Sequence, residues 1–118
     1  MVKILVIEDE QDIREMIQQI LELEGYEVTA AVNGKEGIDY ARKIDPDLIV
    51  CDINMPEIDG FGVIESLKKE KGTGTIPFIF LTARSDKKDI REGMNLGADD
   101  FLNKPFTNST SPLLTDNS

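Results

Sequence analysis

The chain has 118 residues, which suits a single domain with one substantial core. Its 13 Lys and Arg residues stand against 23 Asp and Glu, and this formal charge of −10 argues against nucleic acid or an anionic membrane as a direct partner. The absence of histidine excludes a histidine-based triad, a histidine-ligated metal and a phosphohistidine carrier, and the single cysteine excludes an internal disulfide.

The first predicted element is a strand over Val2 to Ile7, whose nearly continuous apolar character indicates burial on both faces. A helix follows, because apolar residues recur at i, i+3, i+4, i+7 and i+8 from Ile13 to Leu21, and we expect it to end at Gly25. Residues 26–31 alternate enough to predict an edge strand.

The middle of the chain repeats this order of helix and strand. Asn33 and Glu36 predict a capping box for a second helix, which must end before Pro46. Leu48 to Cys51 predicts another buried strand, in which the cysteine packs. Asp59 is expected to cap a third helix.

The last third contains two more strands around one helix. Ile76 to Leu81 predicts a buried strand, and residues 86–96 predict a fourth helix with Ile90 and Met94 facing inward. Phe101 and Leu102 predict a final short strand. Strict alternation of strands and helices implies right-handed crossovers and an α/β fold, with helices on both faces of a parallel sheet.

The composition changes after Phe106. Six of the twelve residues from 107 to 118 are Ser or Thr, so we expect a domain over residues 1–106 and a disordered or irregular tail over 107–118. No apolar run reaches transmembrane length, and Met1 leads directly into a strand without a signal peptide. We therefore expect a soluble, cytoplasmic protein with no membrane partner.

The polar residues that can carry chemistry each follow directly on an apolar run. They are the carboxylates Glu8, Asp9 and Asp52, the hydroxyl of Thr82 and the ammonium of Lys104. Because ligands bind at the carboxyl ends of parallel strands, these five side chains should converge in one crevice.

Three carboxylates in one crevice favour a bound cation. Two of them about 4 Å apart repel by roughly 4 kcal/mol at an effective dielectric near 20. Oxygen ligands without His or Cys favour Mg²⁺ or Mn²⁺, and Mg²⁺ commonly completes its shell with phosphate oxygens. Glu8 and Asp9 alone also fit an acidic pair at a helix N-terminus, but their combination with Asp52, Thr82 and Lys104 favours phosphoryl chemistry.

Five segments of the chain carry a family pattern: Ile4 to Glu10, Asp52 to Gly60, Phe80 to Ala83, Gly97 to Phe101 and Lys104 to Phe106. Through them, residues 1–106 resemble the receiver domain of two-component response regulators. The resemblance implies a doubly wound, flavodoxin-like sheet of five parallel strands in the order 2-1-3-4-5, as in chemotaxis receivers. It also implies a phosphoprotein of signal transduction, and no turnover of an external substrate.

The resemblance implies that Asp52 accepts a phosphoryl group from a sensor histidine kinase or a phosphotransfer protein. Glu8, Asp9 and Asp52 would hold Mg²⁺, with Mn²⁺ as a substitute, and Asn54 would add its backbone carbonyl. In the same segment, Asp59 and Gly60 would serve as scaffold, the first as a helix cap and the second for close backbone approach.

The resemblance also implies a conformational switch. Thr82 would hydrogen-bond a phosphoryl oxygen, Lys104 would pair with the phosphoryl group, and Phe101 would turn inward as the aromatic partner of Thr82 in the switch.

The chain departs from the family pattern in two ways. Glu8 stands where an aspartate is common, and water between the metal and the carboxylate can absorb the extra methylene. The fifth amphipathic helix expected after Phe106 is missing or replaced. Its loss should leave apolar side chains of the first, fourth and fifth strands partly uncovered, with self-association through that face or marginal stability as the result.

Other functions fit the sequence less well. A phosphatase with an aspartyl nucleophile needs a second Asp at the position of Asn54. A flavin or dinucleotide carrier needs a phosphate loop after the first strand, where Glu8 to Glu10 would repel phosphate. The alternative that remains is a receiver-like interaction module that works without phosphorylation.

Overall fold

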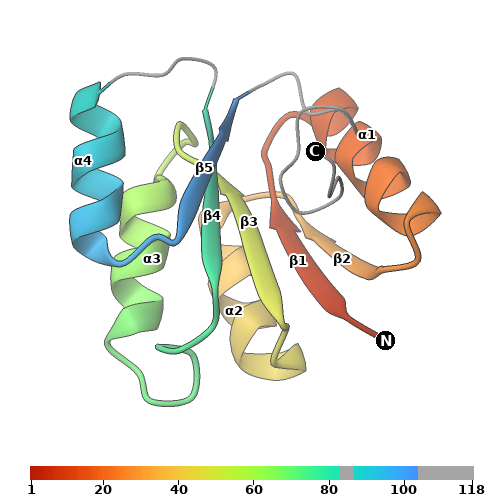
Figure 1. The fold of residues 1–118 in the computed structure, drawn as a ribbon, viewed down its shortest axis with the longest axis horizontal. Coiled ribbons are helices and arrows are strands. Elements are labelled where there is room, and N and C mark those ends of the chain that lie inside the picture. Colours follow the sequence, from red (N-terminus) through yellow and green to blue (C-terminus); the bar gives the residue numbers. More distant parts are fainter. Residues whose placement is uncertain (83–86, 104–118) are drawn as a thin grey trace.

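Strands and helices alternate through the part of the chain that the computed structural model describes, residues 1–82 and 87–103 (Figure 1). These residues form one five-stranded parallel sheet in the order β2-β1-β3-β4-β5, which confirms the predicted topology. Its elements are β1 (Lys3–Ile7), α1 (Gln11–Leu23), β2 (Glu27–Ala31), α2 (Gly34–Ile44), β3 (Leu48–Asp52), α3 (Gly60–Lys68), β4 (Phe78–Thr82), α4 (Lys87–Leu96) and β5 (Asp100–Asn103).

The predicted helix caps are present. Asn33 Oδ1 accepts a hydrogen bond from the backbone N–H of Glu36 at 2.8 Å. The Glu36 carboxylate reaches back to the N–H of Val32 at 2.9 Å, one residue before the usual partner in a capping box. At the start of α3, Asp59 Oδ1 accepts from the N–H of Gly62 at 2.9 Å. Both helix starts are therefore fixed by short polar side chains at the positions that the sequence indicates.

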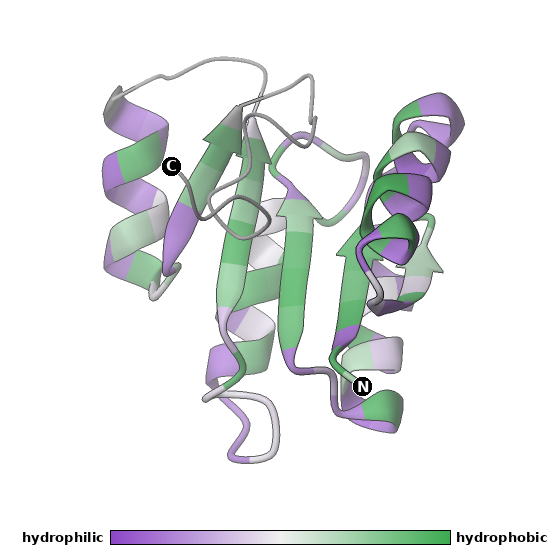
Figure 2. Ribbon diagram, turned by 45° about the vertical axis from the view of Figure 1, so that its right-hand side comes forward, coloured by the Kyte–Doolittle hydropathy of each residue, from purple (hydrophilic) through white to green (hydrophobic). Residues whose placement is uncertain are grey.

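The sheet separates two hydrophobic cores, and its central strands are apolar along most of their length (Figure 2). Successive residues of a strand point to opposite faces, so Leu5 and Ile7 pack toward α2 and α3, whereas Ile4 and Val6 pack toward α1. Burial on both faces explains why β1, β3 and β4 read as continuous apolar runs. None of the described helices is both long and apolar enough to cross a lipid bilayer.

The prediction for the inner face of α4 is wrong at Met94, whose side chain is 48% exposed. Gly93 is buried instead, and a Cβ placed there would lie 2.5 Å from Phe101 Cζ. The helix approaches the sheet so closely at this turn that it presents backbone, and the hydrophobic pattern cannot register a residue without a side chain.

The prediction of no helix over 107–118 lies outside the described residues. Its expected consequence, partly uncovered apolar side chains on β1, β4 and β5, is wrong. Ile4, Ile79, Leu81 and Leu102 are each exposed by 5% or less, and all four belong to a single buried cluster. The apolar surface that we expected to drive self-association is therefore not exposed on these strands.

Two aspartates satisfy backbone donors at the amino ends of the strands. Asp47 Oδ2 accepts from the N–H of Lys3 at 2.8 Å, and Asp99 Oδ2 accepts from the N–H of Phe78 at 2.8 Å. Asp99 belongs to the segment from Gly97 to Phe101, which carries part of the family pattern. Its role is structural, since it accepts the first backbone hydrogen bond of β4 at the end of the sheet opposite Glu8, Asp9 and Asp52.

Candidate functional site

Three carboxylates meet at the carboxyl ends of β1 and β3. These strands are neighbours, with Ile7 opposite Cys51, so Glu8 and Asp9 after one strand lie beside Asp52 at the end of the other. One carboxylate oxygen from each of the three lies within 4.8 Å of the others. Glu8 is 0% exposed and Asp52 is 4% exposed, so their charges are close together and largely shielded from water.

Three of the other four predicted site residues lie in the part of the chain that the structure describes. Thr82 is the last residue of β4, one position beyond the pair of Asp52 with Leu81, and its side chain is buried. Asn54 lies in the loop after β3 with an exposed side chain. Phe101 lies in β5 opposite Phe80. Lys104 lies outside the described residues.

The acidic group has the donor chemistry that suits a hard divalent cation. Its ligands are all carboxylate oxygens, and the chain has no histidine to add nitrogen. Asp9 Oδ1 is buried and accepts no hydrogen bond from the described part of the chain. A buried carboxylate oxygen is costly without a donor or a cation, so the group fits Mg²⁺ or Mn²⁺.

Cys51, directly before Asp52 in β3, is buried in the core and does not join the chemistry. Burial raises the pKa of its thiol well above the ordinary value, and the negative charges of Asp52 and Glu8 raise it further. Cys51 Sγ donates to the carbonyl oxygen of Asp52 at 3.2 Å. The thiol therefore stays protonated, and its role is the packing role that we predicted from its strand.

Arg14 of α1 contacts the acidic loop, and sequence reasoning missed it. Its Nη1 donates to the carbonyl oxygen of Glu8 at 3.0 Å and, at a longer 3.5 Å, to that of Asp9. A guanidinium held on two successive carbonyls fixes the backbone that carries both carboxylates. The available signal was an arginine one turn into the helix that follows an acidic pair.

The loop after β3 is held against Asp52 by close backbone packing. The N–H of Gly60 donates to the carbonyl of Ile53 at 2.7 Å. A Cβ at Gly60 would lie 2.4 Å from the carbonyl oxygen of Asp52, so the expected need for glycine at this position is confirmed. Glu57 in the same loop has φ +68°, a left-handed conformation that is uncommon outside glycine.

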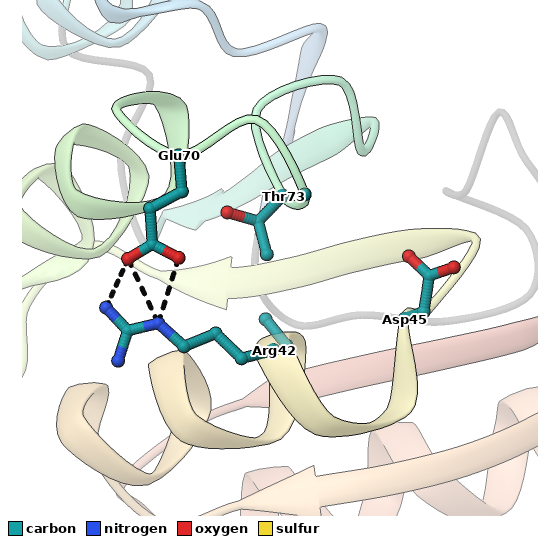
Figure 3. A pocket seen from close by; sticks show the side chains of 6 residues that line it. Arg42, Asp45, Glu70 and Thr73 are labelled. Carbon is teal, nitrogen blue, oxygen red and sulfur yellow. Dashed lines mark hydrogen bonds and ion pairs between the residues drawn. The ribbon is translucent and has the colours of Figure 1, made fainter.

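A hollow at the opposite end of the sheet is lined by α2 and the loop before β4 (Figure 3). Across it, Arg42 Nε donates to both carboxylate oxygens of Glu70 at 3.0 Å, and Arg42 Nη2 makes a further contact with one of them. The Arg42 hydrogen bond lowers the pKa of Glu70, and Glu70 raises the pKa of Arg42. The hollow has none of the predicted site residues in its lining.

This ion pair predicts a small pH dependence of stability. Because the pKa of Glu70 is lower in the folded state, the pair stabilises the fold above the ordinary carboxyl value of 4.5 and loses this effect as the pH falls through the folded pKa. Both side chains are partly exposed, at 49% and 38%, so salt should screen the effect. Urea unfolding of the wild type and Glu70→Gln should differ slightly at pH 7 and converge in acid or high salt. Glu65→Gln on α3 is the control, and a difference that persists in acid would contradict the assignment.

Comparison with known proteins gives one consistent family. A family model described as the response regulator receiver domain matches residues 4–112. Response regulator SaeR of Staphylococcus aureus is 42% identical over 107 residues, which are 91% of this chain and 46% of SaeR. The protein ycf27 of Porphyridium aerugineum, named as a probable transcriptional regulator, is 44% identical over 105 residues, which are 89% of this chain and 42% of ycf27. The chain thus spans less than half the length of these relatives.

Solved structures give the same result. Chemotaxis protein CheY4 of Vibrio cholerae superimposes with a TM-score of 0.87 at 34% identity, covering 91% of this chain and 89% of CheY4. The receiver domain of a signal transduction histidine kinase from Syntrophus aciditrophicus has a TM-score of 0.81 at 38% identity, covering 91% of this chain and 81% of that one.

Proposed function

This chain belongs to the response regulator receiver domains of two-component signalling, and we propose that it accepts a phosphoryl group on Asp52. The observation that carries the proposal is the position of Asp52, buried at the end of β3 within 4.8 Å of carboxylate oxygens from Glu8 and Asp9. Such a cluster supplies both a nucleophilic oxygen and a set of ligands for a divalent cation.

The transfer that we propose is a displacement at phosphorus. A carboxylate oxygen of Asp52 attacks the phosphorus of a phosphohistidine, the phosphorus–nitrogen bond breaks, and the imidazole nitrogen leaves with the electron pair. Glu8, Asp9, Asp52 and the carbonyl of Asn54 are the residues that would hold Mg²⁺, which neutralises charge on the attacking and transferring groups when bound. The crowded carboxylates support this assignment.

The remaining predicted residues would act on the phosphoryl group after transfer. Thr82, which is buried at the end of β4, would donate its hydroxyl to a phosphoryl oxygen. Lys104 would pair with the same group through its ammonium charge. Phe101 would then change rotamer with Thr82, which is the switch that carries the signal.

The phosphoryl donor would be a phosphohistidine on a separate kinase, since these 118 residues contain no histidine. We propose a cytoplasmic sensor histidine kinase or phosphotransfer protein in this role, and no direct contact with nucleic acid. We also propose residues 1–106 as the receiver unit. The second candidate is a receiver-like module that binds its partners without phosphorylation, but the retained phosphoacceptor and acidic pair argue against it.

The experiment that tests the proposal is incubation with acetyl phosphate and Mg²⁺, followed by intact-mass measurement. One hydroxylamine-labile phosphoryl group per chain is expected, because an acyl phosphate is cleaved by hydroxylamine. An unlabelled protein, with either acetyl phosphate or a phosphorylated kinase, would favour the interaction module.

The contact of Arg14 with the acidic loop gives a prediction about metal affinity. Arg14→Lys keeps the positive charge but loses the planar donor group that grips the Glu8 carbonyl. Supports of metal ligands typically contribute 10–100-fold to affinity, so we expect Mg²⁺ to bind about 10-fold more weakly. NMR titration with Mg²⁺ measures this, with Arg91→Lys on the exposed face of α4 as the control. An unchanged affinity in Arg14→Lys would show that the loop holds its shape without the guanidinium.

A further inference from the structure

The ring of Phe80 fills the space between two glycines on different helices. Phe80 lies in β4 and is 0% exposed. A Cβ at Gly60, the first residue of α3, would lie 2.9 Å from Phe80 Cε1. A Cβ at Gly93 of α4 would lie 2.9 Å from Phe80 Cε2 and 3.0 Å from Cδ2. Because Cε1 and Cε2 are on opposite edges of the ring, the ring spans the gap between the two helices.

One edge of this ring reaches the backbone of the proposed phosphoacceptor. The same Cβ position at Gly60 that meets Phe80 lies 2.4 Å from the carbonyl oxygen of Asp52 and 2.9 Å from Ile53 Cα. The Asp52 backbone and the Phe80 ring therefore both lie against Gly60, where a side chain would otherwise stand. Because Gly60 has no side chain, a shift of the backbone at Asp52 passes directly to the Phe80 ring.

The other edge reaches the proposed switch aromatic. The rings of Phe80 and Phe101 have centroids 5.3 Å apart at an interplanar angle of 40°. A Cβ at Gly93 would lie 2.5 Å from Phe101 Cζ as well as beside Phe80, so α4 rests on both rings at this residue. Phe80 and Phe101 cannot both keep their positions if Gly93 moves inward.

We propose that Phe80 is a positioning residue that couples the backbone at Asp52 to Phe101 and α4. Protein interiors are close-packed and transmit displacement, and an aromatic ring between two backbone segments is a rigid spacer. The contact does not depend on phosphorylation, but its use in signalling rests on the function proposed above.

The chain provides a matched control in Phe78. Phe78 is also in β4, faces the same core and is 1% exposed, and its ring lies 5.0 Å from that of Phe80. None of the three atoms nearest to the Cβ position of Gly60 or Gly93 belongs to Phe78. Phe78→Leu and Phe80→Leu thus remove the same ring from the same core, and only the second removes the spacer.

The first test uses Gly93→Ala, whose added methyl group should press on the Phe80 ring. The amide NMR resonances of Ile53 and Gly60, on the far side of the ring, are expected to shift. This shift should disappear in Gly93→Ala/Phe80→Leu and persist in Gly93→Ala/Phe78→Leu. Changes confined to α4 and β5, or a shift that survives loss of the Phe80 ring, would overturn the coupling. No phosphoryl group is needed, so this result is independent of whether Asp52 can be labelled.

A second test examines the same coupling without Gly93→Ala, in case that variant does not fold. The wild type, Phe80→Leu and Phe78→Leu are titrated with beryllofluoride and Mg²⁺, a mimic of the phosphoryl group. Resonances around Asp52 should respond in all three proteins, whereas the response of α4 and Phe101 should be largely lost only in Phe80→Leu. A full response in Phe80→Leu, or an equal loss in both variants, would reject the role of Phe80.

Discussion

Incubation with acetyl phosphate and Mg²⁺ is expected to add one phosphoryl group to the wild-type chain and none to the Asp52→Asn variant. The reason is chemical, since a carboxylate oxygen is the attacking nucleophile and a neutral amide is a poor one. Asparagine has nearly the same shape as aspartate, so the buried end of β3 should keep its structure. Intact-mass measurement before and after hydroxylamine follows the reaction, and labelling of Asp52→Asn should fall to the background.

Asp59 offers the matched control for this experiment. It lies in the loop that follows Asp52 and caps α3 by accepting from the N–H of Gly62. Asparagine caps helices about as well as aspartate, so Asp59→Asn should be labelled like the wild type. Undiminished labelling of Asp52→Asn would place the phosphoryl group on another carboxylate, and Asp9 would be the next candidate because it shares the acidic group.

The central strands could be predicted from the sequence because their buried environment requires continuous runs of apolar residues. β1, β3 and β4 are buried on both faces, so almost every position must be apolar. The starts of α2 and α3 were equally predictable, because Asn33 and Asp59 cap through their own short side chains. Local physics is sufficient at these positions, and no knowledge of distant contacts is needed.

The acidic group was predictable for a different reason. Glu8, Asp9 and Asp52 each follow a buried strand, and a parallel sheet brings the ends of its strands to one edge. The contact of Arg14 with the Glu8 carbonyl was not predictable, because a bond from a side chain to backbone leaves no periodic pattern. The roles proposed for Thr82 and Lys104 remain predictions.

Gly93 shows where hydrophobic periodicity fails. The pattern of α4 assigns the inner face to large apolar residues and therefore selected Met94, which is 48% exposed. The close approach of α4 to Phe80 and Phe101 instead requires a residue without a side chain. A pattern based on side-chain hydrophobicity cannot distinguish a glycine chosen for close contact from one that is merely tolerated.

Replacement of Gly60 is the second change for which we expect a large effect, both on stability and on phosphorylation. Gly60→Ala would place a Cβ 2.4 Å from the Asp52 carbonyl oxygen and 2.9 Å from Ile53 Cα, and both are backbone atoms that cannot rotate away. Overpacking of a filled core costs about 1–3 kcal/mol, and a clash with backbone belongs at the top of this range. We expect the free energy of unfolding to fall by about 3 kcal/mol, measured in urea. Labelling of Asp52 by acetyl phosphate should slow as well, because its carbonyl must move.

Gly62→Ala, two residues along the same helix, separates this clash from the general effect of replacing a glycine. The Cβ at Gly62 would meet the side-chain atom Ile58 Cγ2 at 3.0 Å and Asp59 Oδ1 at 3.6 Å, and it would not meet the backbone at Asp52. Alanine is favoured over glycine within helices by up to about 1 kcal/mol, which offsets a small adjustment of Ile58. Gly62→Ala should therefore stay within about 1 kcal/mol of the wild type and be labelled at the same rate. Equal stability and equal labelling of both variants would mean that the loop after Asp52 yields to a Cβ at Gly60, and that this glycine does not hold the phosphoacceptor in place.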